Sequence, residues 1–191
     1  MPIWIPDKVG YGEHEDRGSR FLAWVFLAEE EEVFAKQLEQ VKAEHPKARH
    51  WCWAWRIQEA YRFEDDGEPG GTAGRPMLQV LEGRSLSRVG AVCVRYFGGV
   101  KLGTGGLMRA YGGATAKAAD DAGVQEVIPR MRIPVFLSFA RTAVREEVRV
   151  KFPTAVFEGD FQDAGWSGTV EVDKLDAPAI HELFWEPLRG S

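Results

Sequence analysis

The sequence predicts a mixed helix-and-strand protein built from two domains, which we place at residues 1–128 and 129–191. Three observations support this prediction. Segments with helical apolar spacing alternate along the chain with short strand-like apolar segments. The chain has 191 residues, which is long enough for two small domains. Near residues 124–134 the segment VQEVIPRMRIP changes its pattern and contains two prolines, which is typical of a domain boundary.

The first domain begins with a strand at residues 21–27, which are nearly all apolar. A helix is expected at residues 29–47, because four glutamates suit the positive end of its dipole and apolar residues at helical spacing form one stripe. Residues 49–57 predict a strand with three alternating tryptophans on one face. Such a row could stack nucleobases, but we expect it to pack against a helix, because each indole buries a large apolar area.

Three further elements complete the first domain. Pro76 fits the first turn of a short helix that ends at Gly83. Residues 89–97 are so apolar that they predict a central strand. Thr104 is the expected N-cap of a helix that runs to residue 121, and Gly123 is its stop. Two glycines inside this helix are expected to permit close packing on the sheet: Gly112 and Gly113.

The second domain shows the order strand, helix, strand, strand, helix, which predicts a small ferredoxin-like, split βαβ fold. The elements are expected at residues 135–139, at 142–152, around Phe157, around Val170 and at 180–184. The first of the two helices is amphipathic, so one of its faces can cover the sheet.

The composition is that of an ordinary globular protein, with 45% hydrophobic and 28% charged residues. No apolar run is long enough to span a membrane, and the first residues lack the pattern of a signal peptide. We therefore expect a cytoplasmic protein without a membrane partner. Cys52 and Cys93 have no spacing typical of zinc, so we expect two buried free thiols.

The charge is unevenly distributed along the chain. A net charge of −5 argues against a protein that coats nucleic acid without selectivity, and nothing indicates DNA specificity. Residues 69–119 have a positive net charge instead, since they contain seven basic residues and a single acid, Glu82. A confined basic face of this kind can serve one anionic partner. The alternative is a solvated mixed surface that is balanced by acids elsewhere in the fold.

Two glycine-rich loops flank the predicted central strand. The first lies in EDDGEPGGTAGRPM at residues 64–77, and the second lies in VRYFGGVKLGTGGLMRAYGG at residues 94–113. The second loop fails the P-loop pattern, because Thr104 and Gly105 stand where lysine and then serine or threonine are needed. It also fails the dinucleotide fingerprint, which would need glycine in place of Met108. Neither of these nucleotide-binding classes is supported.

The second loop still predicts an anion pocket. Exposed N–H groups at the start of a helix attract anions, and cationic side chains nearby would add charge. The alternative is a strand-to-helix joint whose glycines serve packing and whose arginines pair with the acidic first loop. The residues predicted to bind the anion or RNA are Arg95, Gly98, Gly99, Lys101, Gly103, Thr104, Gly105, Gly106 and Arg109.

The first loop contributes three carboxylates, Asp65, Asp66 and Glu68. With His50 they could hold magnesium or manganese, which would indicate a metal-dependent hydrolase of a small phosphorylated compound. The same sequence is a favourable turn without any metal. We assign no metal and no cofactor, and we give this loop a supporting role beside the arginines. No serine, cysteine or histidine has evident partners for nucleophilic catalysis, so we name no catalytic residue.

Four segments resemble the IMPACT/YigZ family. They are RGSRFLAW at residues 17–24, EHPKARHWCWAW at 44–55, DDGEPGGTAGRPML at 65–78 and VRYFGGVKLGTGGLMRAYGGA at 94–114. They occur in the same order as in that family, and the likeness extends over residues 15–125. The second domain resembles the family's second domain by pattern alone.

This resemblance implies an α+β protein. The N-terminal domain would have the fold of elongation factor G domain IV (small-subunit ribosomal protein domain 2-like), and the C-terminal domain would be ferredoxin-like. Eukaryotic relatives are linked to translational control, so the resemblance implies a translation-associated regulator that binds RNA, a ribosomal component or a protein partner, and favours a non-enzymatic role. The family's second domain ends with a further strand, whereas this sequence stops at residues 185–191, so we expect a sheet of three strands.

Overall fold

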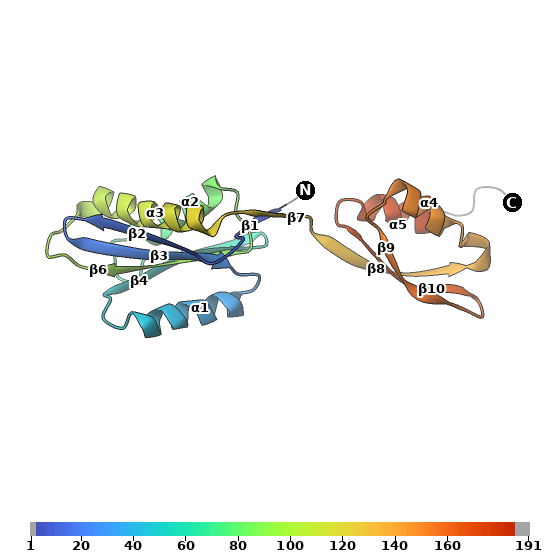
Figure 1. Ribbon diagram of the computed structural model, residues 1–191, viewed down its shortest axis with the longest axis horizontal. Coiled ribbons are helices and arrows are strands. Elements are labelled where there is room, and N and C mark those ends of the chain that lie inside the picture. Colours follow the sequence, from blue (N-terminus) through green and yellow to red (C-terminus); the bar gives the residue numbers. More distant parts are fainter. Residues whose placement is uncertain (1–2, 186–191) are drawn as a thin grey trace. The chain divides into compact units, whose positions relative to one another are not determined.

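The computed structural model describes residues 3–185 of the chain. Contacts within the chain divide it into two compact units, Ile3–Val127 and a second one that begins at Ile128. Both units mix helices and strands, as the sequence predicts (Figure 1). None of the helices in the described part of the chain is long and apolar enough to cross a membrane.

The first unit is built on one antiparallel sheet of five strands. Its central strand is β6, which is buried along nearly its whole length and therefore needs the continuous apolar run that the sequence shows. This confirms the predicted central strand. In spatial order the strands are β2 (Gly10–Asp16), β3 (Ser19–Leu27), β6 (Val89–Tyr96), β4 (His50–Ile57) and β5 (Ala60–Glu64).

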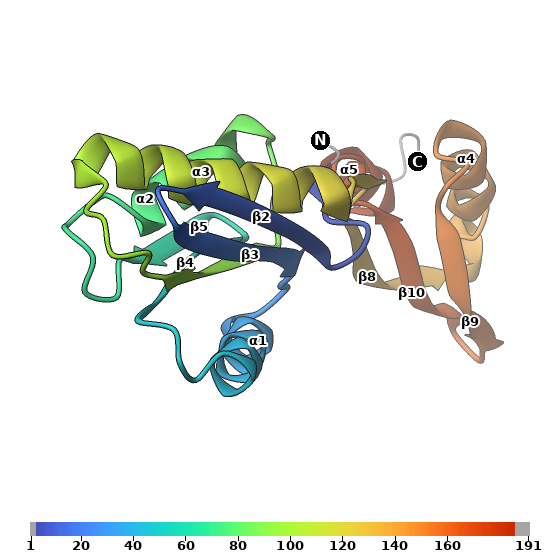
Figure 2. The same cartoon turned by 60° about the vertical axis from the view of Figure 1, so that its left-hand side comes forward.

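Helices cover both faces of this sheet. Figures 1 and 2 show α2 (Gly74–Gly83) and α3 (Gly103–Ala122) on one face and α1 (Glu31–Glu44) on the other. The alternation along β4 matches this arrangement, since its cysteine and alanine belong to the core under α2 and α3 while its tryptophans belong to the core beside α1. The ring centre of Trp53 lies 5.1 Å from that of Phe34 on α1. The prediction that the tryptophan row packs against a helix is therefore confirmed.

Four strands of the first unit were not predicted. β2 has the sequence GYGEHED and β5 has the sequence AYRFE, and both are edge strands without an alternating apolar pattern. The other two strands, β1 (Ile3–Ile5) and β7 (Gln125–Val127), have three residues each and pair with one another, so neither carries a local signal. β2 and β5 pair in hairpins with the neighbouring strands β3 and β4, whereas β1 and β7 are joined only by long-range pairing.

The two cysteines of the chain are free and buried, as predicted. Cys52 on β4 lies directly opposite Cys93 on β6. Burial raises the pKa of both thiols, so both stay protonated at neutral pH and behave as small apolar side chains.

The helix α3 lies very close to the sheet at two glycines of β2. A Cβ atom at Gly10 would lie 2.1 Å from the carbonyl oxygen of Ala118, and one at Gly12 would lie 2.4 Å from the backbone nitrogen of the same residue. By contrast, a Cβ atom at Gly112 would lie 3.8 Å from Pro76, and one at Gly113 would lie 3.4 Å from a side-chain nitrogen of His14. The expectation that the two helical glycines permit the close packing is therefore wrong, because the glycines that do so belong to the strand.

Replacing Gly10 with alanine is expected to destabilise the protein by about 2 kcal/mol, because the added methyl group meets backbone atoms that cannot rotate away. Urea unfolding of the full chain measures the change. The matched control is Gly70→Ala, since nothing lies within 4 Å of a Cβ atom at Gly70. Equal stability of the two variants would contradict the close contact of β2 with α3.

The second unit has the predicted order strand, helix, strand, strand, helix. Its three strands form an antiparallel sheet in the order β8-β10-β9. The first strand starts earlier than expected, because residues 130–134 also pair with β10. The predicted absence of a fourth strand concerns residues 186–191, which lie outside the described residues. The elements are β8 (Arg130–Ser138), the short 3-10 helix η1 (Phe139–Arg141), α4 (Val144–Lys151), β9 (Val156–Gln162), β10 (Gly165–Asp173) and α5 (Ala177–Trp185).

Candidate functional site

The start of α3 differs from the prediction. The helix begins at Gly103, the residue before it is Leu102, and no side chain caps its first turn. Thr104 is therefore not the N-cap. Because Gly103 has a φ of +72°, a conformation that favours glycine, the chain can turn sharply from the loop into the helix. The first N–H groups of a 20-residue helix are thus left without a side-chain acceptor.

Gly98 has a different role in the same loop. A Cβ atom there would lie 2.0 Å from the backbone carbonyl carbon of Gly18, so only glycine allows the two loops to meet. Its backbone N–H donates a hydrogen bond of 3.1 Å to the hydroxyl of Ser19. This amide is therefore used inside the fold.

A cavity of about 390 Å³ opens at the start of α3. Residues from β4, β6, the acidic loop and the start of α3 meet there. Four of the residues that the sequence analysis selected for anion binding line it, as does Glu68 from the acidic loop, while Gly98, Gly99, Gly105, Gly106 and Arg109 do not. The lining residues are Arg49, His50, Glu68, Pro69, Arg95, Phe97, Lys101, Leu102, Gly103, Thr104 and Leu107.

A buried ion pair forms the inner wall of this cavity. Arg95 Nη1 donates a hydrogen bond of 2.7 Å to Glu68 Oε1, and the side chains are only 7% and 4% exposed. The hydroxyl of Tyr111 on α3 donates a second hydrogen bond of 2.8 Å to the same oxygen. Burial raises the pKa of this phenol, so the hydroxyl stays protonated and remains a donor. The charge of Arg95 is therefore compensated, as the packing alternative predicted.

One buried nitrogen of that guanidinium has no hydrogen-bond partner among the described residues. Arg95 Nε is buried and makes no hydrogen bond with any residue in the range 3–185. Its guanidinium carbon lies 5.5 Å from the ring centre of Phe21 and 5.4 Å from that of Phe97. A buried N–H group without an acceptor is uncommon and costs free energy.

The two aspartates of the acidic loop bind backbone groups. The carboxylate of Asp65 accepts hydrogen bonds of 2.7 Å from the N–H of Gly71, 2.9 Å from that of Ala73 and 2.8 Å from that of Gly74. It therefore caps the start of α2 and suits the positive end of that helix. The carboxylate of Asp66 accepts a hydrogen bond of 2.7 Å from the N–H of Trp51 on β4. Both side chains hold the loop in place.

His50 connects this loop to the cavity. Its Nδ1 lies 2.7 Å from the backbone carbonyl oxygen of Asp66, and its Nε2 lies 3.9 Å from Glu68 Oε1. Its position on β4, directly opposite Arg95, brings it to the site.

The carboxylates do not fit the alternative of a magnesium or manganese site. Asp65, Asp66 and Glu68 each already accept hydrogen bonds from the protein. Across residues 3–185, no three or more histidine, cysteine or carboxylate side chains are grouped to hold a metal ion.

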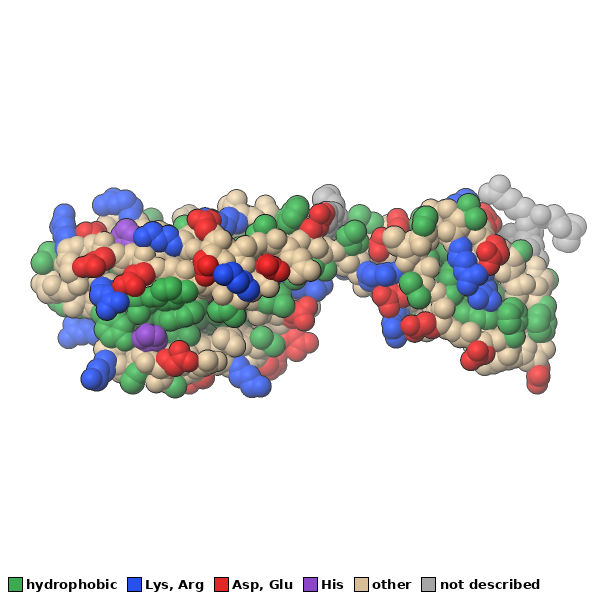
Figure 3. Space-filling view, in the orientation of Figure 1, with side chains coloured by type: hydrophobic (Ala, Val, Ile, Leu, Met, Phe, Trp, Pro, Cys, Tyr) green, Lys and Arg blue, Asp and Glu red, His purple; other side chains and the backbone are tan. Residues whose placement is uncertain are grey.

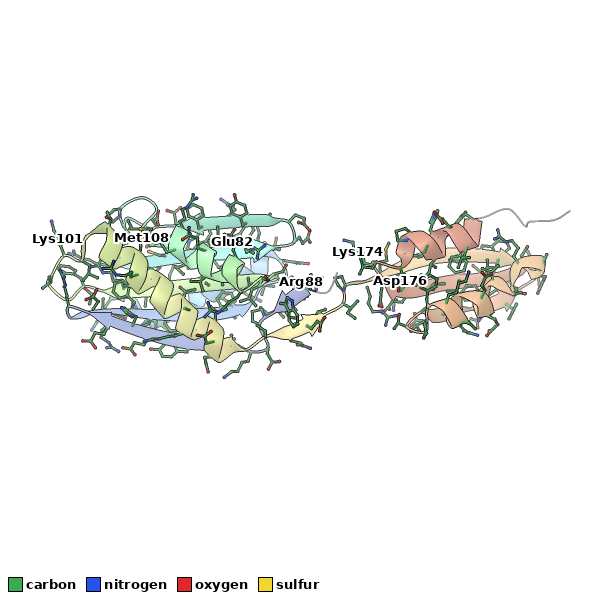
Figure 4. All side chains as sticks on the ribbon, turned by 90° about the horizontal axis from the view of Figure 1, so that it is seen from above. Glu82, Arg88, Lys101, Met108, Lys174 and Asp176 are labelled. Atoms are coloured by element: carbon green, nitrogen blue, oxygen red, sulfur yellow. The ribbon has the colours of Figure 1, made fainter. Side chains whose placement is uncertain are left out.

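Two cationic side chains at the cavity have no acidic partner. No carboxylate of the described chain lies within ion-pair distance of Arg49 or Lys101. Figure 4 shows Lys101 projecting from the loop before α3. In Figure 3, Lys and Arg side chains gather at the end of the first unit where α3 begins. Arg109 lies along the first turns of α3, with Nη1 3.6 Å from the Cβ position of Gly105.

Sequence reasoning missed several residues of the site. The sequence pattern does not single out Arg49 or Phe97, and it presents His50 either as a metal ligand or as a strand histidine bonded to a neighbour. Phe97 directly follows the central strand and begins the glycine-rich loop, and this position in the sequence could have indicated it as a site residue. Arg49 and His50 reach the cavity through the pairing of β4 with β6, and nothing in the sequence specifies that register.

Comparison with known proteins identifies the family. Residues 17–119, more than half of the chain, match the family described as the Impact N-terminal domain. The chain belongs to the IMPACT family. An IMPACT family member from Haemophilus influenzae is 34% identical over 163 residues, which cover 83% of this chain and 79% of that protein. The IMPACT family member YigZ of Escherichia coli is 43% identical over 135 residues, which cover 68% of this chain and 66% of that protein.

A solved structure agrees with the fold of this IMPACT family chain. The crystal structure of a hypothetical protein aligns with 94% of this chain and 89% of its own, at 32% sequence identity and a TM-score of 0.70. The resemblance stated from the four sequence segments is therefore confirmed.

Proposed function

We propose that this IMPACT family protein is a translation-associated regulator that binds RNA or a ribosomal component through the cavity at the start of α3. It would act without catalysis and in the cytoplasm. One observation carries the proposal: the uncapped first turn of α3 faces the same cavity as Arg49 and Lys101, which have no acidic partner in the described chain.

The physical basis is electrostatic. The free N–H groups at a helix start carry partial positive charge, and the two side chains add two full charges next to them. Because Arg95 is compensated by Glu68, we assign the anion-binding charge to Arg49 and Lys101, and we give Arg95 the task of shaping the wall. Arg109 does not line the cavity, so it would at most add positive charge from outside it.

The family supports the translational part of the proposal, since its eukaryotic members are linked to translational control. The fold assignments implied by the family are also proposals: a domain like domain IV of elongation factor G for the first unit, and a ferredoxin-like domain for the second. The strand order β8-β10-β9 and the order of elements support the second assignment. The metal-dependent hydrolase is disfavoured, because the acidic side chains that it needs already bind Arg95 and backbone N–H groups.

A filter-binding titration of the full chain against structured RNA tests the proposal. With two cationic contacts, the logarithm of the binding constant should fall with the logarithm of salt concentration with a slope of about −1.4 to −1.8. Lys101→Ala removes one cationic contact, so the slope should become less steep by about 0.7 to 0.9. The matched control is Lys36→Ala, an exposed lysine on α1, which should leave the slope unchanged.

Two results would count against RNA binding at this site. One is the absence of any binding at low ionic strength, and the other is an affinity that does not respond to salt. If a partner from cell extract is instead retained after nuclease treatment, and retention needs Lys101, the cavity serves an acidic protein partner and the RNA proposal fails.

A further inference from the structure

We propose that the cavity at the start of α3 holds one nucleotide, with its base on the ring of Phe97 and its phosphate between Lys101, Arg49 and the first turn of α3. The ligand class is a nucleoside monophosphate, either free or as the phosphorylated end of an RNA strand. This inference rests on the proposed function and specifies what the cavity recognises.

The size of the cavity favours a single nucleotide over a length of RNA backbone. A volume of about 390 Å³ falls within the usual range of small-molecule sites. Proteins that follow a strand of RNA use an extended groove with a row of cations and several stacking rings. Here the cavity wall supplies two cations without an acidic partner and one exposed aromatic ring, Phe97.

The polar and apolar parts of the wall are arranged for such a ligand. Phe97 is 45% exposed although it lines a cavity, and the guanidinium of Arg95 lies 5.4 Å from its ring centre. Leu102 and Leu107 extend the apolar surface next to it. An aromatic face beside aliphatic side chains suits a planar base, while the cations and free N–H groups suit a phosphate.

The partnerless nitrogen of Arg95 is independent evidence for a ligand. Arg95 is 6% exposed and lines the cavity, yet its buried Nε has no acceptor among residues 3–185. Because a buried donor without an acceptor costs free energy, a small rotation of the Arg95 side chain that brings Nε to an acceptor in the cavity would be favoured. The carbonyl oxygens and ring nitrogens of a nucleobase are such acceptors. The phosphate, in contrast, is bound by Lys101 and Arg49.

Isothermal titration calorimetry of the full chain with the four nucleoside 5′-monophosphates tests this inference. At least one should bind, and its nucleoside and inorganic phosphate should each bind at least about tenfold more weakly, because each lacks one half of the contacts. Phe97→Leu keeps apolar volume but removes the aromatic face, and should weaken binding about tenfold. The matched control is Phe136→Ala, which removes an exposed phenylalanine of β8 and should have no effect.

Short RNA strands with and without a terminal phosphate separate the two sources of the ligand. Tighter binding of the phosphorylated strand than of the free nucleotide assigns the site to an RNA end, and the reverse assigns it to the free nucleotide. If RNA binds in a Lys101-dependent way but no monophosphate binds and the terminal phosphate has no effect, this inference fails while the proposed function stands. If inorganic phosphate binds as well as every nucleotide, or Phe97→Leu changes nothing, base recognition is excluded. If nothing binds, both proposals fail.

Discussion

Replacing Glu68 with leucine is expected to lower the free energy of unfolding by about 3–5 kcal/mol, because it leaves the charge of Arg95 buried without a counter-ion. Both side chains are almost completely buried, so solvent cannot take over the role of the carboxylate. The variant also removes the acceptor of the Tyr111 hydroxyl. Urea unfolding of the full chain, followed by circular dichroism, measures the loss.

A double variant distinguishes the loss of the pair from the loss of packing. Glu68→Leu combined with Arg95→Met replaces both charges by apolar groups, and should recover much of the stability lost in the single variant. The control Glu59→Ala changes an exposed glutamate and should have little effect. The loss of unfolding free energy in the double variant could instead equal the sum of the losses in the two single variants. In that case the two charges would not be coupled, and the ion pair would not stabilise this part of the fold.

Replacing Asp65 with alanine should destabilise the protein by about 3 kcal/mol, because two backbone N–H groups at the start of α2 and that of Gly71 in the preceding loop lose a charged acceptor. Asp65→Asn keeps one acceptor oxygen, so its loss of stability should be about half that of Asp65→Ala. Urea unfolding compares both variants with Asp163→Ala, which changes an exposed aspartate between β9 and β10. If Asp65→Ala were as stable as this control, the carboxylate would not be the cap of α2.

Much of the fold of the first unit could be predicted, because its central elements carry strong local signals. β6 is a continuous apolar run that is buried on both faces, and α1 and α3 have helical apolar spacing with clear limits, such as Gly123. β2 and β5 could not be predicted, because edge strands need few apolar residues and because the glycines of β2 serve contact with α3 instead of strand formation.

The candidate site could be predicted as a region but not in its contacts. Glycine density selected the segment around the start of α3, and four of the residues selected there line one cavity. The roles of the acids could not be read from the sequence, because the direction of a carboxylate depends on which donors the fold brings near. Asp65 reaches residues six to nine positions further along the chain, whereas Glu68 reaches Arg95 on a different strand.

The hydrogen bond from His50 to Asp66 fixes the tautomer of this imidazole. A backbone carbonyl oxygen can only accept, so Nδ1 carries a hydrogen, and in the neutral form of the ring Nε2 is then an acceptor, 3.9 Å from Glu68 Oε1. In that form Nε2 and the carboxylate of Glu68 are two acceptors that cannot bond to each other. If the cavity binds an anion as proposed, the ligand bound best would be one that also brings a hydroxyl or amino hydrogen to these two acceptors.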